Sequence, residues 1–139
     1  MNDVEIRPMI AADVQATTLL AAEDDSVWTA ADYLGFDTLV ATVDKGILVG
    51  FACSRTLVAD TEHEVLNVLV APNQRGQGIG SKLMKTLLAA KTGIWFLEVR
   101  EGNVAARSLY TSLGFSDFGR RKRYYQKPYE DAIVMRYCS

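Results

Sequence analysis

Hydrophobic residues recur along the chain with two different spacings, and together these predict a mixed α/β fold. Alternating or continuous apolar runs predict strands at residues 4–9, 37–43, 46–59, 62–70, 94–99, 116–125 and 131–137. Helical spacing and cap residues predict helices at 11–23, 29–34, from the glycine-rich turn at 75–80 to about residue 91, and from Asn103 to Gly114. The order β-α-α-β-β-β-α-β-α-β-β favours a mixed sheet with helices on its faces. The unit from 62 to 99 is expected to be a right-handed parallel crossover.

Residues within these elements give more specific expectations. The first helix is expected to carry on its apolar face Val14, Thr18 and Ala22. The helix after the glycine turn has an apolar stripe made of Ile79, Leu83, Met84, Leu87 and Leu88. Residues 24–26 predict a turn and cap, and residues 44–46 predict a hairpin. Gly114 is expected to end its helix in the left-handed conformation, with Phe115 folded back onto that helix.

Composition adds limits on domain organisation and partners. A length of 139 residues predicts a single domain spanning 1–139, and 49% hydrophobic residues are enough for a core. The net charge of −2 argues against broad affinity for nucleic acid or anionic membranes. The basic run 120–123 is the local exception. It could meet an acidic partner or ribosomal RNA, but a solvated strand edge is the commoner explanation.

Cysteine and histidine content excludes the usual metal sites. Cys53 and Cys138 are far apart, and with His63 alone the chain cannot build a His/Cys zinc cluster, so no metal is expected. His63 is predicted to be a surface turn residue without a functional role. No signal peptide or membrane-spanning run is recognisable, and a cytoplasmic protein that does not bind membranes is therefore expected.

The turn at residues 75–80 is the strongest candidate for a ligand site. A helix N-terminus offers free backbone N–H groups to phosphate, and its glycines would let a ligand approach the backbone. A tight turn without a ligand is the alternative. Two nucleotide-binding motifs fail on spacing because Ser81 stands where each requires a glycine. What remains is R-x-x-G-x-G, formed by Arg75, Gly78 and Gly80.

This motif, between a strand and a long helix, resembles the cofactor motif of the GNAT superfamily of N-acetyltransferases, and the resemblance covers nearly the whole chain. It implies a central mixed, mostly antiparallel sheet with a β-α-β core that binds acyl-CoA and helices on both faces. It also implies acetyl-CoA as the co-substrate. The residues implied to bind it are Val68, Leu69 and Val70 along the pantetheine arm, Arg75, Gly76, Gln77, Gly78, Ile79, Gly80 and Ser81 at the pyrophosphate, and Asn103.

An amine must arrive neutral to attack a thioester, so such an enzyme needs a base. Glu98 is the candidate, because it is the one charged residue inside the apolar run 94–99 and lies near the carboxyl end of a predicted buried strand. Strand alternation places it on the face of Ile94 and Phe96. From the residues alone, a structural ion pair, for example with Arg100, is the commoner fate of such a carboxylate.

Tyr110 is the candidate acid for the departing thiolate. Asn103, Arg107 and Tyr110 share one face of the last helix by their spacing. A core tyrosine with a satisfied hydroxyl is the alternative. The pattern Asn103-x-x-Ala-x-x-Leu-Tyr110-x-x-Gly-Phe is similar to the second GNAT signature, in which the asparagine contacts the cofactor and the tyrosine protonates the thiolate.

Within the superfamily, residues 97–100, 123–125 and 130–135 resemble the RimI group, which acetylates the N-terminal alanine of a ribosomal protein. That resemblance implies Glu98 as general base, Tyr110 as general acid, and direct transfer in a ternary complex without an acetyl-enzyme. A small-molecule amine as acceptor and a non-catalytic acyl-CoA-binding sensor are the alternatives. A monomer or homodimer is expected, with a protein or peptide N-terminus as partner and no specific nucleic acid.

Overall fold

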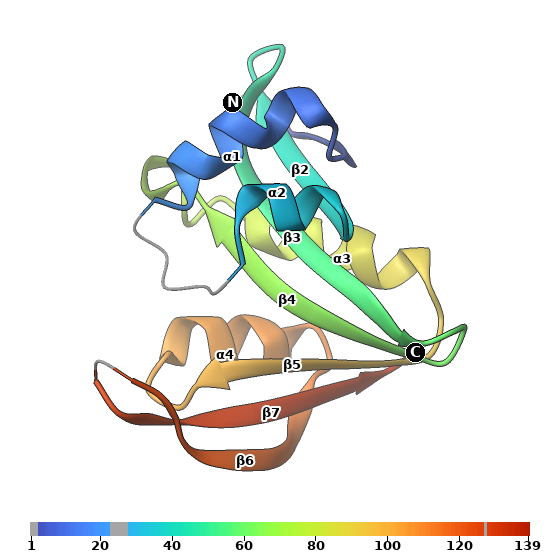
Figure 1. Ribbon diagram of the computed structural model, residues 1–139, viewed down its shortest axis with the longest axis vertical. Coiled ribbons are helices and arrows are strands. Elements are labelled where there is room, and N and C mark those ends of the chain that lie inside the picture. Colours follow the sequence, from blue (N-terminus) through green and yellow to red (C-terminus); the bar gives the residue numbers. More distant parts are fainter. Residues whose placement is uncertain (1–2, 23–27, 127) are drawn as a thin grey trace. The chain divides into compact units, whose positions relative to one another are not determined.

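The computed structural model describes residues 3–22, 28–126 and 128–139 (Figure 1). Its strands are β1 (Glu5–Pro8), β2 (Asp37–Val43), β3 (Ile47–Val58), β4 (Glu62–Val70), β5 (Ile94–Arg100), β6 (Ser116–Tyr125) and β7 (Glu130–Cys138). Its helices are α1 (Val14–Leu20), α2 (Ala30–Leu34), α3 (Ile79–Ala90) and α4 (Val104–Ser112), with short 3-10 turns η1 (Ala11–Asp13) and η2 (Pro72–Gln74). The predicted order of strands and helices is confirmed.

The strands are hydrogen-bonded in the order β1-β2-β3-β4-β5-β7-β6. β4 and β5 run parallel, whereas the pairs β1/β2, β2/β3, β5/β7 and β6/β7 are antiparallel. The predicted mixed, mostly antiparallel sheet is therefore confirmed. The chain separates into two compact units, the first comprising Met1–Arg55 and Leu66–Ala90 and the second Thr56–Val65 and Lys91–Ser139.

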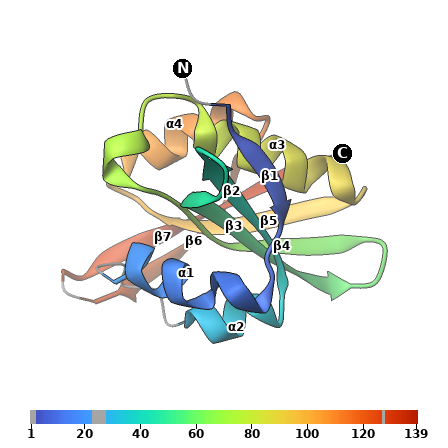
Figure 2. The same cartoon turned by 90° about the horizontal axis from the view of Figure 1, so that it is seen from above.

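In the first unit, helices cover both sides of β1 to β3. α1 and α2 lie on one side of these strands and α3 on the other (Figure 2). The core on the α1–α2 side is formed by Met9, Tyr33, Val40, Phe51 and Cys53. The α3 side receives the predicted apolar stripe, all of which is buried: Ile79, Leu83, Met84, Leu87 and Leu88.

Close packing of β3 against β4 and α3 requires a glycine at position 50. A Cβ atom there would lie 2.9 Å from the carbonyl oxygen of Leu69 and 3.3 Å from a methyl group of Leu83. The hairpin before β3 is confirmed as well, because Asp44, Lys45 and Gly46 all have positive φ angles. Gly50 thus allows β3 to pack closely against the end of β4, the strand that leads into the glycine turn.

The predicted face of the first helix is wrong. Thr17 is fully buried, whereas Thr18 is exposed and donates its hydroxyl proton to the Val14 carbonyl at 2.8 Å. The segment starts as a 3-10 turn, whose three residues per turn change the phase of the helix that follows. Ala22 lies beyond the end of α1 and is exposed. The predicted turn at 24–26 lies outside the described residues.

In the second unit, β5 lies between the first half of β4 and β7. The parallel register joins Glu62, His63 and Glu64 to Ile94, Trp95 and Phe96. α4 covers one face of β5 and β7 (Figure 1). Phe115, which follows the helix, contacts β7: its ring packs against the ring of Tyr137, with 5.5 Å between the centroids. Gly114, with φ +105°, leaves room for that ring, as predicted for the end of this helix.

His63 is not a surface turn residue, so this prediction is wrong. It lies within β4 with only 2% of its surface exposed. Its ring nitrogens lie 3.1 Å from the Thr56 hydroxyl and 3.0 Å from the Thr92 carbonyl oxygen, and its ring packs against Trp95. Because Thr92 and Trp95 are distant in sequence, local polarity did not predict this burial.

Candidate active site

The glycine turn joins η2 to α3 and presents open backbone. Gly76 and Gly78 both have φ +80°, a backbone conformation that residues with a Cβ rarely adopt. No heavy atom of the described residues lies within 4 Å of a Cβ built on either glycine. The N–H of Lys82 donates to the Gly78 carbonyl at 3.0 Å and so begins the helical hydrogen-bond series.

The first turn of α3 therefore suits an anion. The N–H groups of Ile79, Gly80 and Ser81 precede the first helical hydrogen bond and point along the axis out of the helix. The partial positive charge of a helix N-terminus favours phosphate there. The residues present fit a pyrophosphate group, which needs backbone donors and an absence of side chains more than it needs a particular cation.

The strand before the turn is tied to it by Arg75. Its Nε donates to the Val70 carbonyl at 3.0 Å. Val68, Leu69 and Val70 are half-buried at the end of β4, and the next residue, Ala71, donates its N–H to the Val49 carbonyl at 2.7 Å. The predicted cofactor-binding residues from 68 to 81 thus form one continuous strand-turn-helix segment of the first unit, in which Gln77 is exposed.

Glu98 lies on the predicted face of β5. Trp95, Leu97 and Val99 are buried, whereas Glu98 is half-buried with 18% of its side chain exposed. Its Oε1 lies 2.9 Å from the Nε of Arg121 on β6. Glu98 is therefore ion-paired, as the alternative interpretation of this carboxylate expects, with Arg121 as its partner, while the guanidinium of Arg100 lies 3.4 Å from Glu130.

Glu98 faces away from α4. Trp95 and Tyr137 are partners in the antiparallel register of β5 and β7, so their side chains share one face of the sheet. That face is the one covered by Phe115 and α4, because Tyr137 packs on Phe115. Residues of odd and even number alternate along β5, which places Glu98 on the opposite face.

Tyr110 lies on α4 and is half-buried. Burial raises the pKa of its hydroxyl to about 12. Its ring packs near Phe115, with 6.0 Å between centroids, and its carbonyl accepts the Phe115 N–H. In the second unit the two predicted catalytic residues therefore lie on different sides of β5, a separation that residue spacing did not predict.

Asn103 is the N-cap of α4, as predicted. Its Oδ1 accepts the N–H of Ala106 at 3.1 Å, and Asn103 is exposed. The same amide carries two N–H donors on its other end. A contact with a cofactor would therefore use the nitrogen while the oxygen keeps the cap.

A family model for the acetyltransferase (GNAT) family matches residues 9–115. The chain belongs to the GNAT family. It is 36% identical over 144 residues to the N-alpha-acetyltransferase RimI of Mycobacterium tuberculosis, a match that covers 96% of this chain and 91% of that protein. It is 35% identical over 109 residues to a ribosomal protein bS18-alanine N-acetyltransferase of Escherichia coli, covering 74% of this chain and 70% of the relative.

The fold agrees with that membership. The crystal structure of the ribosomal-protein-S18-alanine N-acetyltransferase from Escherichia coli superposes with a TM-score of 0.84 at 27% identity, covering 97% of this chain and 93% of that one. The chain is thus a GNAT enzyme with an N-acetyltransferase fold, and acetyl-CoA is the co-substrate typical of this family.

Two side chains near Glu98 in this GNAT enzyme were not predicted as site residues. Arg121 pairs with Glu98, and the charge of Glu98 raises the pKa of the nearby Tyr124. The sequence offered one signal, the run of basic and aromatic residues from 120 to 125, but it did not indicate which of them would reach the carboxylate.

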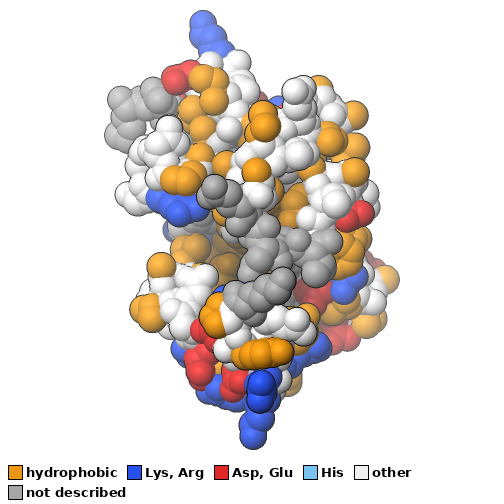
Figure 3. All heavy atoms as spheres, turned by 60° about the vertical axis from the view of Figure 1, so that its left-hand side comes forward, with side chains coloured by type: hydrophobic (Ala, Val, Ile, Leu, Met, Phe, Trp, Pro, Cys, Tyr) orange, Lys and Arg blue, Asp and Glu red, His pale blue; other side chains and the backbone are white. Residues whose placement is uncertain are grey.

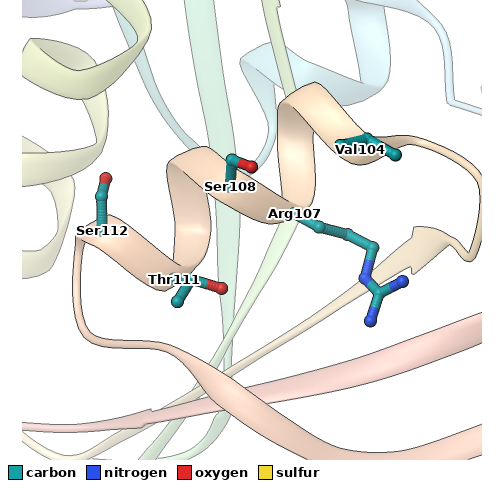
Figure 4. Close-up of a pocket in the computed structure, with 5 residues that line it drawn as sticks. All are labelled: Val104, Arg107, Ser108, Thr111 and Ser112. Atoms are coloured by element: carbon teal, nitrogen blue, oxygen red, sulfur yellow. The ribbon is translucent and has the colours of Figure 1, made fainter.

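A shallow hollow of about 490 Å³ lies on the outer surface of α4 (Figure 4). Its lining is formed by Val104, Arg107, Ser108, Thr111 and Ser112. None of the predicted catalytic residues lines it, so it is separate from the proposed chemistry. In the described ranges no three metal-ligating side chains are grouped together, and every helix there falls short of the length and hydropathy of a membrane span.

Proposed function

We propose that this acetyltransferase modifies the N-terminal α-amine of a protein, with the N-terminal alanine of ribosomal protein bS18 as its specific acceptor. The observation that carries the proposal is the 36% identity to a RimI protein across 96% of the chain. Further relatives, from Haemophilus influenzae and Escherichia coli, are ribosomal protein bS18-alanine N-acetyltransferases. An acceptor of this kind would place the enzyme in the cytoplasm, as the sequence analysis expects.

The glycine turn is proposed to hold the pyrophosphate of acetyl-CoA. The backbone N–H groups from Gly76 to Ser81 would donate to its oxygens, and Val68 to Val70 would run beside the pantetheine arm. Asn103 would donate from its side-chain amide. Acetyl-CoA supplies an activated acetyl group, so what remains for the chain is proton transfer and positioning.

Glu98 is proposed to be the general base. An N-terminal amine has a pKa of about 8 and is largely protonated at neutral pH, so a carboxylate that removes the proton makes it a nucleophile. Glu98 would accept this proton, directly or through a water molecule. The amine then forms a bond to the acetyl carbon, the bond from that carbon to sulfur breaks, and the second proton that the nitrogen gives up leaves with the CoA sulfur or goes to water.

Tyr110 is proposed to act on the departing sulfur. Its pKa of about 12 keeps the hydroxyl protonated at neutral pH, which a proton donor requires. A free thiol of the cysteine type has a pKa of about 8.5. The hydroxyl would therefore stabilise the thiolate mainly through a hydrogen bond, with the proton shared rather than fully lost.

Glu98 and Tyr110 lie on opposite sides of β5, and both can serve one reaction if the reacting atoms lie at the edge of that strand. The parallel register with β4 runs to Phe96, and Glu98 comes two residues later. Glu98 on one face of β5 would then act on the acceptor amine, and Tyr110 on the other face would act on the departing sulfur.

Direct transfer is proposed in place of an acetyl-enzyme. Burial raises the pKa of the Cys53 thiol to about 11, so this residue is a poor nucleophile at neutral pH. Cys138 is the last residue of β7, opposite Ile94 at the far end of β5 from Arg100. Neither cysteine has a place in the proposed mechanism.

A screen of acceptors tests the proposal. Peptides beginning with Ala and with the bS18 sequence, the same peptides with a blocked N-terminus, and a set of small amines would be compared by release of CoA. We expect the free-alanine peptide to have the highest kcat/KM and the blocked peptide to give none above background. Preference for a small amine would replace the proposed acceptor, and CoA binding without turnover on any acceptor would indicate a sensor.

A further inference from the structure

The arginines of the basic run on β6 contact acidic and aromatic side chains within the second unit. Arg120 pairs with Glu101 and with Asp131, the latter at 2.8 Å. Arg123 lies over the ring of Tyr129 at 4.7 Å. Basic and acidic side chains are mixed over β6 and β7, in the lower part of Figure 3. The run is therefore not a uniform positive surface for an acidic partner.

Arg121 is the member of this run that reaches the proposed base. Its Nε lies 2.9 Å from Oε1 of Glu98, although β7 separates the two strands in the sheet. The guanidinium carbon lies 5.2 Å from the centroid of the Tyr124 ring. The arginine is thus held between an aromatic ring and a carboxylate, which limits the orientations of both charged groups.

Tyr124 lies near the same carboxylate. The negative charge of Glu98 is the largest cause that raises the pKa of Tyr124, and burial adds to it. The ring of Tyr124 is therefore placed close to both Glu98 and the guanidinium of Arg121.

An irregularity of β6 makes this arrangement possible. Arg121 is opposite Ala132 and Tyr125 is opposite Glu130, so β6 uses more residues than β7 over the same length. Arg123, within this irregular stretch, has φ +52°, a left-handed backbone conformation that residues other than glycine rarely adopt. In a regular strand, residues 121 and 124 would point to opposite faces. The bulge instead brings their side chains together beside Glu98, and bulges of this kind often redirect side chains near active sites.

We propose that Arg121, resting on Tyr124, is a positioning residue that holds the Glu98 carboxylate in the orientation needed to take a proton from the acceptor amine. This inference rests on the proposed function of Glu98 as the general base. Arg121 acts through Glu98 and does not itself take part in proton transfer.

Removal of Arg121 is not expected to disturb the fold. Its side chain is 58% exposed, so its loss creates no cavity, and an exposed ion pair contributes about 0–1 kcal/mol to stability. An effect on turnover without an effect on thermal unfolding would therefore come from the orientation of Glu98.

Three single variants test the proposal with acetyl-CoA and a synthetic peptide that begins with alanine. Arg121→Gln removes the charge and the fork of donors, and we expect kcat to fall about tenfold while the KM for acetyl-CoA and the unfolding temperature stay close to wild type. Arg121→Lys keeps the charge and is expected to recover part of kcat. Lys122→Gln, which removes the same charge at the neighbouring position, is the matched control and is expected to leave kcat within about twofold.

The double variant E98Q/R121Q separates this inference from the proposed function. If Arg121 acts through Glu98, adding R121Q to E98Q lowers kcat no further. A loss of the same size in both backgrounds, or an unchanged or raised kcat in R121Q alone, would overturn the positioning role while leaving Glu98 as base. If E98Q itself turns over like the wild type, Glu98 is not the general base and the positioning role of Arg121 fails with it, while the proposed acceptor is tested separately by the screen of peptides and amines.

Discussion

The glycine turn and the surface around Glu98, which we propose serve the same reaction, are built in different ways. The turn uses backbone: two glycines with positive φ and the N-terminus of α3, within one short segment of chain. The surface around Glu98 uses side chains brought together from β5 and β6, which other elements separate in sequence. A backbone site is specified by residues that are adjacent in sequence, whereas a side-chain site depends on strand pairing.

This difference also divides the expected effects of substitution. Changes in the turn should alter the affinity for acetyl-CoA and leave the chemical step nearly intact. Changes around Glu98 should lower kcat and leave acetyl-CoA affinity nearly intact. Variants that move both quantities together would show that the two regions do not have separate tasks.

The largest effect is expected for Glu98→Gln. Loss of a general base typically costs about 100-fold or more in rate, and we expect kcat to fall by at least that factor. The KM for acetyl-CoA should remain within about twofold, because the glutamine keeps the size of the side chain and the glycine turn is unchanged. Steady-state kinetics with an alanine peptide measures both. A wild-type kcat would remove Glu98 from the mechanism.

Tyr110→Phe is expected to lower kcat by about 10- to 100-fold, as for loss of a hydrogen bond to a charged group. Because burial raises the pKa of Tyr110 from its ordinary value near 10 to about 12, the hydroxyl stays protonated below pH 10. The ratio of wild-type to variant kcat should therefore be constant between about pH 7 and pH 9.5. A wild-type rate that declines in this range, with the decline absent from the variant, would contradict this assignment.

The same pKa has a consequence for stability. From about pH 10 to pH 12 the unfolded chain loses the tyrosine proton while the folded chain keeps it, so the contribution of Tyr110 to the free energy of unfolding is lost as pH rises through that window. Between about pH 10 and pH 12 the unfolding temperature of the wild type should therefore fall relative to that of Tyr110→Phe. Between about pH 7 and pH 9 the difference between the two unfolding temperatures should not depend on pH.

Gly78→Ala is expected to raise the KM for acetyl-CoA about tenfold with little change in kcat. The added Cβ meets no atom of the described protein, but it disfavours φ +80° by about 1–2 kcal/mol and stands where a ligand would approach the backbone. Gly46→Ala is the matched control, since Gly46 also has a positive φ and an open surrounding but lies in the β2–β3 hairpin. An equal change in KM for both variants would argue against a cofactor role for the turn.

The smallest effect is expected for Asn103→Asp. The carboxylate keeps the acceptor that caps α4 but removes the amide donors, so stability should hold while the KM for acetyl-CoA rises about threefold. Asn103→Ala removes both and should in addition lower the free energy of unfolding by about 1 kcal/mol. Thermal unfolding and kinetics on the two variants separate the cap from the proposed cofactor contact.

Much of the fold could be predicted because local patterns decide it. The bounds of β2, β4 and β6 match the predicted ones to the residue, and all five apolar positions of α3 are buried. The failures have non-local causes. His63 is buried by Thr92 and Trp95, which reach it from the segment around the start of β5. The prediction of the buried face of α1 was wrong because a 3-10 turn precedes the helix.

The candidate site shows the same division. Spacing selected the glycine turn, the resemblance to the GNAT superfamily selected Glu98, Asn103 and Tyr110, and their roles in the reaction stay predictions. The partner of Glu98 was not predictable, because Arg100 is its neighbour in sequence while Arg121 is its neighbour in space. A bulge in β6 decides that contact, and the local sequence of basic residues does not reveal it.

The most direct test of the account is to locate the acetyl group on a peptide that carries both an N-terminal alanine and an internal lysine. The wild-type enzyme, acetyl-CoA and this peptide would be incubated, and the product sequenced by tandem mass spectrometry. The account predicts one acetyl group, on the α-amine of the alanine, and its near absence with Glu98→Gln. An acetyl group on the lysine side chain, or equal modification of the α-amine by Glu98→Gln, would contradict it.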